Sequence, residues 1–237
     1  LTTEAKAALG RFDTHTYSDR SSENFAALKQ TAVNSGKNFW MSEVDNGNLA
    51  GTNAKNMGAG LSLAVNILED MNSMQPSAWV MWDILDKHKD AEFVAPNGTN
   101  SEANTSNAQH IGTWGVGMVN HDTKEIELTQ KYYVYGQFTK YINPGDTIIA
   151  SSPTTLAAYN KDTGAIKIVA VNTTGDTQNY RFDLSAFSQT GTSAKIIRTS
   201  GSFTDGEHWK DVGTAEVKDG KFRFDLPANS VTTFVID

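Results

Sequence analysis

The feature that most constrains the fold of this chain is a change in hydrophobic rhythm near residue 145. Before that point, short apolar strands alternate with amphipathic helices, and after it only short strands and turns follow. Alternation of strands and helices predicts βα units with a parallel sheet, whereas short strands separated by turns predict an antiparallel sandwich. The sequence therefore predicts two domains, residues 1–145 and residues 146–237.

The first domain contains three strand-like runs, each followed by a stretch of helical periodicity, at residues 11–17, 38–41 and 78–82. The third run, AWVMW, is continuously apolar, which is typical of a strand buried on both faces. A closed (β/α)8 barrel needs eight such units, so the sequence predicts an incomplete barrel. Because residues 3–9 read as the tail of a helix, we expect an N-terminal part that was removed, is absent or belongs to another chain.

Capping residues and loops divide the first domain further. Ser21 or Ser22 is expected to begin one helix, and Asn53 is expected to cap the next, whose apolar stripe runs to Met71. The polar residues 96–109 read as a loop at the barrel mouth.

The second domain alternates apolar and polar residues with period two. Its strongest turn signal is Asp219-Gly220, a pair that suits a type I′ hairpin turn. Turn signals recur at the short spacing of an all-β domain, with about eight strands expected. This pattern predicts an antiparallel β-sandwich.

Composition excludes several classes of function. The formal net charge is −7 and no basic patch is visible, so nucleic acid is not an expected partner, whereas a neutral polysaccharide is compatible. The chain has no cysteine, which excludes disulfides, thiolate metal sites and cysteine nucleophiles. The histidines show no metal-ligand spacing, and no apolar run is long enough to span a membrane.

One carboxylate stands out at a strand end. Glu43 follows the apolar run that contains Trp40, and a loop rich in Gly and Asn comes next. The carboxyl ends of barrel strands carry the chemistry of this fold, so Glu43 is a candidate glycosidase nucleophile. The alternative is that Glu43 is a solvated loop acid, as most acidic residues are.

The two other strand ends bring further polar and aromatic side chains. His15 and Tyr17 end the first strand, and Trp82 and Asp83 end the third. Neighbouring strands lie about 4.8 Å apart, so these side chains are expected to converge with Glu43. A tryptophan face can stack on a sugar, and a histidine can donate to a sugar hydroxyl. The alternatives are a structural histidine, core aromatics and a loop-capping aspartate.

Four segments carry a resemblance to a known family: FDTHTYS, WMSEVDNG, WVMWDILD and YYVYGQFTKYINPGDTII. In this order and spacing they resemble glycoside hydrolase family 30, and the SEVDNG form looks most like its endo-β-1,6-galactanase branch. The resemblance implies a (β/α)8 TIM barrel with a side β-sandwich. Residues 1–145 would then be barrel strands six to eight with their helices, and residues 146–237 the sandwich.

The resemblance also assigns roles to the strand-end residues. Glu43 matches the nucleophile of a retaining mechanism, at the end of the seventh strand. His15 and Tyr17 match sixth-strand residues of the active site, and Trp82, with Asp83 beside it, matches the eighth strand, where the attacked sugar binds. The general acid/base of the family is a Glu on the fourth strand, which this chain does not contain. We therefore expect residues 1–237 alone to be inactive.

The expected function is an O-glycosyl hydrolase that acts on a polysaccharide or glycan, with β-1,6-galactan favoured and no metal or cofactor needed. Its expected partner is the missing N-terminal barrel half, in the same or another chain. The expected location is secreted or on the cell surface, as in bacteria. The alternatives are a non-catalytic carbohydrate-binding or structural module, and a related specificity such as xylanase or glucosylceramidase-like activity.

Overall fold

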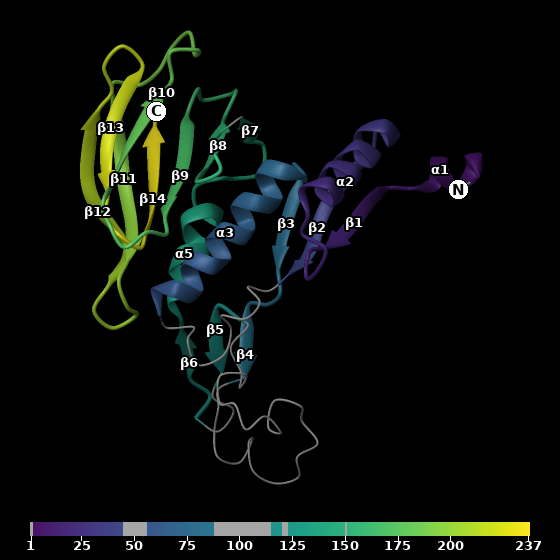
Figure 1. The fold of residues 1–237 in the computed structure, drawn as a ribbon, viewed down its shortest axis with the longest axis horizontal. Helices are drawn as coiled ribbons and strands as arrows, with labels where there is room; N and C mark the ends of the chain where they lie inside the picture. The colour runs from purple at the N-terminus through teal and green to yellow at the C-terminus, as the bar shows by residue number, and fades with distance from the viewer. Residues whose placement is uncertain (1, 45–55, 88–114, 120–122, 150) are drawn as a thin grey trace.

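A computed structural model describes residues 2–44, 56–87, 115–119, 123–149 and 151–237 (Figure 1). Its helices and strands are, in chain order, α1 (Thr3–Ala8), β1 (Arg11–His15), α2 (Ser22–Ser35), β2 (Asn38–Val44), α3 (Met57–Ser73), β3 (Ala78–Met81), β4 (Leu85–Lys87), β5 (Gly117–Val119), β6 (Ile126–Leu128), α5 (Gln130–Thr139), β7 (Thr147–Ile149), β8 (Thr155–Tyr159), β9 (Ile166–Asn172), β10 (Gln178–Asp183), β11 (Ser193–Ser200), β12 (Glu207–Glu216), β13 (Lys221–Leu226) and β14 (Ser230–Ile236). Among these described residues, no helix is long and apolar enough to cross a membrane.

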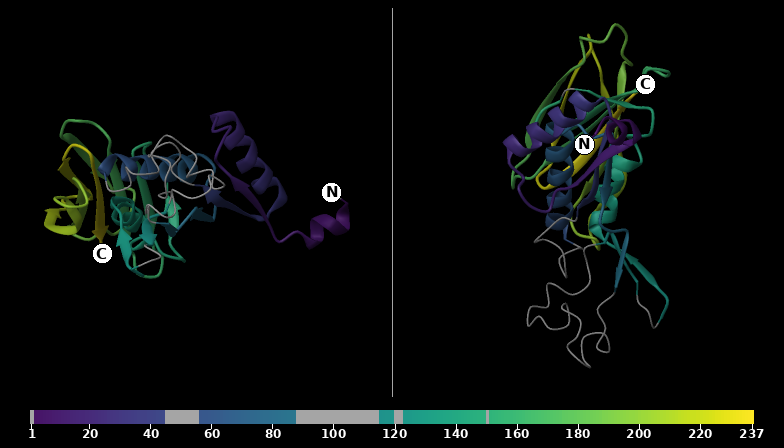
Figure 2. Two further views of the ribbon diagram at one scale, coloured as in Figure 1. Left: turned by 90° about the horizontal axis from the view of Figure 1, so that it is seen from below. Right: turned by 90° about the vertical axis from the view of Figure 1, so that its right-hand side faces the viewer.

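The N-terminal part contains a parallel sheet in the order β1-β2-β3, joined through the crossover helices α2 and α3. This confirms the predicted alternation of strands and helices. Ser21 caps α2 by accepting a hydrogen bond from the Asn24 amide, and Gly36 ends it in the left-handed conformation with φ of 62°. The short helix α1 buries none of its residues and lies at the end of the molecule far from the C-terminal strands (Figure 2).

One face of the parallel sheet is packed against helices. Phe39 and Met41 of β2 point to this face, where they are buried with Phe25 of α2 and Met74, which follows α3. The opposite face carries exposed apolar groups, with Val80 42% exposed. The expectation that the AWVMW strand is buried on both faces is therefore wrong, because the described residues cover only one side of the sheet.

A second small sheet follows β3 and was not predicted. Its order is β4-β5-β6, with β4 parallel to β5 and β5 antiparallel to β6. The backbone carbonyl of Asp83 accepts a hydrogen bond from the Val116 amide at 3.2 Å, so this sheet begins directly beyond β3. The predicted helix that closes the first domain is α5. The loop expected at residues 96–109 lies outside the described residues.

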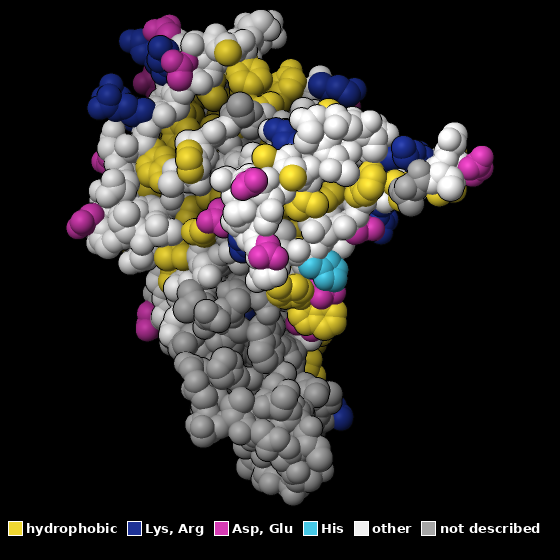
Figure 3. All heavy atoms as spheres, turned by 45° about the vertical axis from the view of Figure 1, so that its right-hand side comes forward, with side chains coloured by type: hydrophobic (Ala, Val, Ile, Leu, Met, Phe, Trp, Pro, Cys, Tyr) yellow, Lys and Arg dark blue, Asp and Glu magenta, His cyan; other side chains and the backbone are white. Residues whose placement is uncertain are grey.

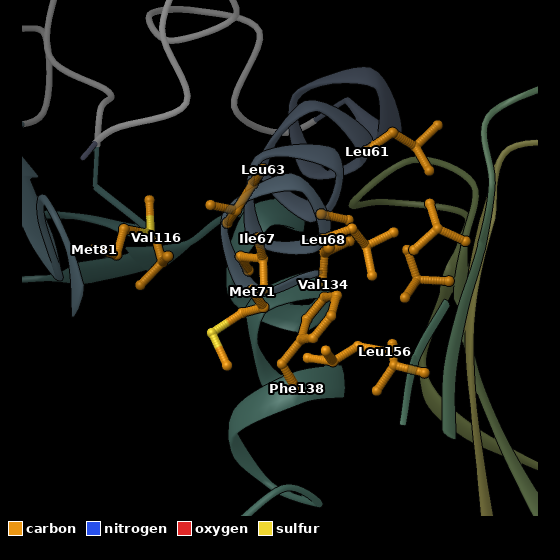
Figure 4. Close-up of a cluster of buried hydrophobic side chains, with 14 of the residues drawn as sticks. Leu61, Leu63, Ile67, Leu68, Met71, Met81, Val116, Val134, Phe138 and Leu156 are labelled. Atoms are coloured by element: carbon orange, nitrogen blue, oxygen red, sulfur yellow. The ribbon is translucent and has the colours of Figure 1, made fainter. Parts of the chain in front are cut away.

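The helices α3 and α5 pack against each other between the two groups of sheets. Leu68, Val134 and Leu156 lie between these helices and the C-terminal strands (Figure 4). A Cβ at Gly60 would lie 2.6 Å from a Val134 methyl carbon, so the close approach of the helices requires glycine there. The helix α3 begins after Asn56, whose side chain makes no cap hydrogen bond, and the predicted cap Asn53 lies outside the described residues.

The C-terminal part is entirely antiparallel. A six-stranded sheet has the order β12-β11-β14-β9-β8-β7, and β10 pairs with β13 in a separate two-stranded sheet. Aromatic side chains join the two sheets, since Phe182 of β10 and Phe222 of β13 both contact Phe234 of β14. A core of fully or nearly fully buried aliphatic residues fills the space around these rings.

The turn predicted at Asp219-Gly220 is present. Both residues have positive φ, 51° and 71°, as a type I′ turn requires. Its hairpin is limited to one bridge between Lys218 and Lys221, and the ladder of β13 is with β10.

Polar contacts hold α5 against the six-stranded sheet. The buried amide of Gln137 donates to the Thr199 hydroxyl at 2.8 Å and accepts from the Thr233 hydroxyl at 2.6 Å. The Trp209 indole donates to the Tyr133 carbonyl at 2.6 Å, and its ring occupies the space beside Gly136 where a Cβ would lie. These contacts fix the helical layer on the antiparallel sheets.

Candidate active site

The backbone around Glu43 is irregular on both sides. The register of β1 with β2 shifts between Thr14 and His15, so that His15 lies opposite Glu43. The register of β2 with β3 also shifts, between Met41 and Val44. Bulges of this kind re-aim side chains and are frequent next to active sites. Phe39, Met41 and Val44 of β2 are thus buried on the helical face while Glu43 is presented at the end of the strand.

Tyr17 contacts the Glu43 carboxylate directly. Its hydroxyl donates a hydrogen bond to Glu43 Oε1 at 2.9 Å, and the tyrosine is 48% exposed. A hydroxyl bonded to a carboxylate is a charge-assisted contact, which holds the carboxylate in one orientation. The sequence analysis expected the two side chains to converge, because both lie at adjacent strand ends.

His15 completes the group at the first two strand ends. Its Nδ1 lies 3.8 Å from Glu43 Oε1, which is too long for a hydrogen bond but close enough for an ion pair when the imidazole is charged. Its ring meets the edge of the Tyr17 ring with centroids 6.0 Å apart. About half of the His15 side chain is exposed, so the ring remains open to a ligand.

The third strand end places Trp82 beside this group. The Trp82 amide donates to the Val44 carbonyl at 2.8 Å, so Trp82 is paired with the residue that follows Glu43. Trp82 is 51% exposed, and Figure 3 shows exposed hydrophobic groups close to a histidine and acidic groups on this side of the molecule. Asp83 follows through a cis peptide bond and has one buried carboxylate oxygen, Oδ1.

A buried acid that the sequence analysis missed lies behind the site. The carboxylate of Asp70 in α3 is fully buried, and its Oδ2 accepts hydrogen bonds from the Thr16 hydroxyl at 3.0 Å and the Trp79 indole at 2.8 Å. Arg20 forms an ion pair with Oδ1 at 3.0 Å. Burial raises the pKa of Asp70, and the contacts with Trp79, Arg20 and Thr16 oppose that rise.

A signal for this acid was present in the sequence. Leu63, Ile67, Asp70 and Met74 follow the spacing of one helical face, and the three apolar members are buried. An aspartate on the apolar stripe of a helix requires partners, because an unpaired buried charge is very costly. The partners themselves come from other elements and could not be identified from this spacing.

The uncovered face of the sheet carries a second polar group. The Arg11 guanidinium lies over the Trp40 ring, 3.9 Å from its centroid, and its Nε donates to Asp13 at 2.8 Å. Residues 11, 13 and 15 alternate along β1, so this group and His15 share one face. The sequence analysis placed Trp40 beside Glu43 but did not identify its cation–π partner.

Within the described ranges, no group of three His, Cys, Asp or Glu side chains is arranged to hold a metal ion. The site instead offers one oriented carboxylate, two hydrogen-bonding rings and an exposed indole. Such a set can bind a sugar and supply a nucleophile, but glycoside hydrolysis uses two carboxyl groups.

The sequence was compared with protein families and with curated proteins. No family model matches the chain. The endo-β-1,6-galactanase of Hypocrea rufa is 24% identical over 229 residues, which cover 95% of this chain and 40% of that protein. The chain therefore spans less than half of this curated relative.

Two solved structures share the fold. A family 30 subfamily 8 xylanase from Clostridium acetobutylicum aligns with a TM-score of 0.67 and 23% identity, over 100% of this chain and 50% of that one. A family 30 endoxylanase from Clostridium papyrosolvens C71 aligns with a TM-score of 0.68 and 20% identity, over 99% of this chain and 50% of that one. The chain thus spans about half the length of these structures.

Proposed function

Because this chain resembles the C-terminal part of glycoside hydrolase family 30 in sequence and in fold, we propose that it is the C-terminal part of a retaining enzyme that hydrolyses a polysaccharide. The observation that carries the proposal is the hydrogen bond from Tyr17 to Glu43 at the end of β2, beside exposed Trp82. In this account the parallel sheet supplies strands six to eight of a (β/α)8 barrel, and the antiparallel sheets after residue 145 form a β-sandwich side domain.

Glu43 is assigned the role of nucleophile. With Oε1 held by Tyr17, Oε2 attacks the anomeric carbon and forms the glycosyl-enzyme ester as the glycosidic bond breaks. The leaving glycosidic oxygen takes a proton from the acid/base, which this account places outside residues 1–237. Water then cleaves that ester in the second step. An orienting hydrogen bond matters here because small displacements of a reacting atom lower the rate strongly.

The second carboxyl group is assigned to a residue outside residues 1–237. Retaining enzymes place their two carboxyl groups about 5–5.5 Å apart across the scissile bond. The resemblance puts the acid/base Glu on the fourth barrel strand, so we propose an N-terminal barrel half, in the same or another chain, as the partner. The exposed Val80 supports this, because strands of a closed barrel would cover that face.

The favoured substrate is β-1,6-linked galactan, the polymer named for the Hypocrea rufa relative. Trp82 is proposed as a platform for the attacked sugar, because sugar C–H surfaces stack on indole faces. His15 and Asp83 are proposed to contact sugar hydroxyls. The protein is proposed to be secreted or displayed on the cell surface, and one structural neighbour, from Bacteroides fragilis, is described as an exported protein.

Xylan is the second candidate substrate, since both solved structures described above are xylanases. The two substrates are distinguished by assaying a joined protein, defined as residues 1–237 with an N-terminal barrel half restored. We expect it to release reducing sugar from β-1,6-galactan faster than from xylan. Faster release from xylan would make xylan the substrate and would leave the assignment of Glu43 as nucleophile unchanged.

The test of the catalytic assignment is Glu43→Gln in the joined protein, which keeps the shape of the side chain and removes its nucleophilic charge. We expect kcat to fall by about 10³-fold or more with folding unchanged. Glu23→Gln, at an exposed position in the first turn of α2, is the matched control and should retain activity. Near-normal activity of Glu43→Gln would overturn the assignment.

A further inference from the structure

We propose that Asp70 is a positioning residue that sets two walls of the candidate active site from the helical side of the sheet. One of its donors, Thr16, precedes Tyr17 at the end of β1, and the other, Trp79, lies on β3 three residues before Trp82. One buried carboxylate thus connects the two strands that flank Glu43. The inference deepens the proposed function and rests on it for its kinetic consequences.

The connection to β1 involves the hydroxyl and the backbone carbonyl of Thr16. Its hydroxyl donates to Asp70 Oδ2 at 3.0 Å, and its carbonyl accepts a hydrogen bond from Arg20 Nη1 at 3.1 Å. Thr16 is only 2% exposed, whereas about half of His15 and Tyr17 lies in solvent. Because consecutive side chains of an extended segment point to opposite sides, anchoring Thr16 on the helical side directs its two neighbours toward the site.

The connection to β3 runs through an indole. Trp79 Nε1 donates to Asp70 Oδ2 at 2.8 Å, and the Trp79 ring also contacts Tyr135 of α5. In the sheet Trp79 pairs with Met41, and the strand continues to the Trp82 amide, which donates to the Val44 carbonyl. Fixing the indole against α3 therefore sets how far β3 extends, and with it the position of Trp82.

Asp70 faces two donors and one positive charge. Thr16 and Trp79 both donate to Oδ2, and the Arg20 guanidinium lies 3.0 Å from Oδ1 as an ion pair. An asparagine could keep one acceptor oxygen for Thr16 and Trp79, but its amino group, a donor, would then face Arg20. Burial raises the pKa of Asp70, and its contacts with Trp79, Arg20 and Thr16 oppose that rise.

Two single-donor variants of the joined protein test the proposal. Thr16→Val removes the hydroxyl with little change of shape, and we expect kcat to fall about tenfold with KM changed less than about twofold, because Tyr17 no longer orients the nucleophile. Trp79→Phe removes the indole donor, and we expect KM to rise about fivefold with kcat nearly unchanged, because the Trp82 platform is displaced. Asp70→Ala, which removes the acceptor shared by both donors, should show both effects.

A loss of stability alone would not separate kcat from KM in this way. If Thr16→Val and Trp79→Phe change the same parameter by the same factor, the positioning role is overturned. These two variants also decide the question if Asp70→Ala does not fold.

The matched control is Glu69→Gln. Glu69 is the neighbouring residue on α3, binds the same Arg20 side chain at 2.9 Å, and has 51% of its side chain exposed. The substitution also removes one negative charge beside Arg20, but Glu69 binds no residue of either strand end. We therefore expect kcat and KM to remain within about twofold of the parent. An effect equal to that of Asp70→Ala would assign the result to Arg20 and overturn the proposal.

Crystal structures of variants of residues 1–237 test the positioning role of Asp70 without an activity assay. In Thr16→Val we expect the Tyr17–Glu43 hydrogen bond, 2.9 Å here, to be broken, and in Glu69→Gln to be retained. A retained bond in Thr16→Val contradicts the positioning role. If the joined parent protein hydrolyses no glycan, the proposed function fails, and these structures still decide whether Asp70 positions Tyr17.

Discussion

The two sheets that flank the central helices use similar residues but complete their packing to different extents. In the antiparallel part, Phe234 is fully buried between two sheets and contacts aromatic rings from both β10 and β13. In the parallel part, Val80 of the apolar strand β3 and Trp82, which follows that strand, remain substantially exposed. The antiparallel part buries its apolar side chains among the described residues. The parallel sheet buries the apolar side chains of one face only.

The difference teaches where to look for function. Exposed aromatic and charged residues on a sheet face indicate either a ligand or a further protein layer, since large apolar patches are rarely left in water. On the parallel sheet we apply both interpretations, a further protein layer for one residue and a ligand for another. The exposed Val80 is assigned to contact with other barrel strands, and the exposed Trp82 to contact with substrate.

The largest effect that the comparison predicts concerns the incomplete region. Residues 1–237 alone should hydrolyse β-1,6-galactan at least about 10³-fold more slowly than the joined protein, because a second carboxyl group is needed opposite Glu43. Reducing-sugar release from equal molar amounts of the two proteins measures this. Equal rates would show that the chain contains its own acid/base. The exposed face of the parallel sheet would then not indicate a missing catalytic half.

The next effect separates the two regions by stability. Phe234→Ala should lower the free energy of unfolding of residues 1–237 by about 3–5 kcal/mol, because it removes a buried ring and leaves a cavity. Trp82→Ala should change it by about 0.5 kcal/mol or less, because the side chain is half exposed. Urea denaturation of the two variants provides the values. A large loss for Trp82→Ala would return that residue to the core.

The smallest effect is a pH dependence of the antiparallel region. Two hydrogen bonds from Arg198, on β11, lower the pKa of Glu207 on β12 to about 2, and Ser200 and Lys210 contribute. Because the folded-state pKa lies below the unfolded value of about 4.3, this stability is fully present above pH 4.3 and is lost as pH falls toward 2.

The matched variant is Glu207→Gln, which should remove stabilisation on the order of 2 kcal/mol at pH 7 and less at pH 3. Unfolding free energies of the parent and the variant at several pH values supply the comparison. A difference between them that does not shrink at acidic pH would show that the ion pair adds no pH-linked stability.

Local patterns predicted the elements of the fold better than their partners. The period of each strand and the Asp219-Gly220 pair are encoded in neighbouring residues, so the alternation of the first region and the turn of the second could be predicted. The pairing of β13 with β10 joins segments about forty residues apart, and local spacing does not specify it. Exposure of Val80 depends on which layers surround the strand, which AWVMW alone does not encode.

The candidate site shows the same division. The contact of Tyr17 with Glu43 followed from the rule that parallel strand ends meet at one edge. Asp70 was missed because acids are expected at the surface, and its burial depends on donors from three separate elements. The role of Glu43 as nucleophile remains a prediction.

That role is tested most directly by a mechanism-based fluoro-sugar inactivator, which leaves a stable ester on the nucleophile of a retaining glycosidase. The joined protein is treated with the reagent, digested, and its labelled peptide identified by mass spectrometry. The account predicts one sugar adduct, on Glu43, and none after Glu43→Gln. An adduct on any other carboxylate, with Glu43 unmodified, would contradict the central claim.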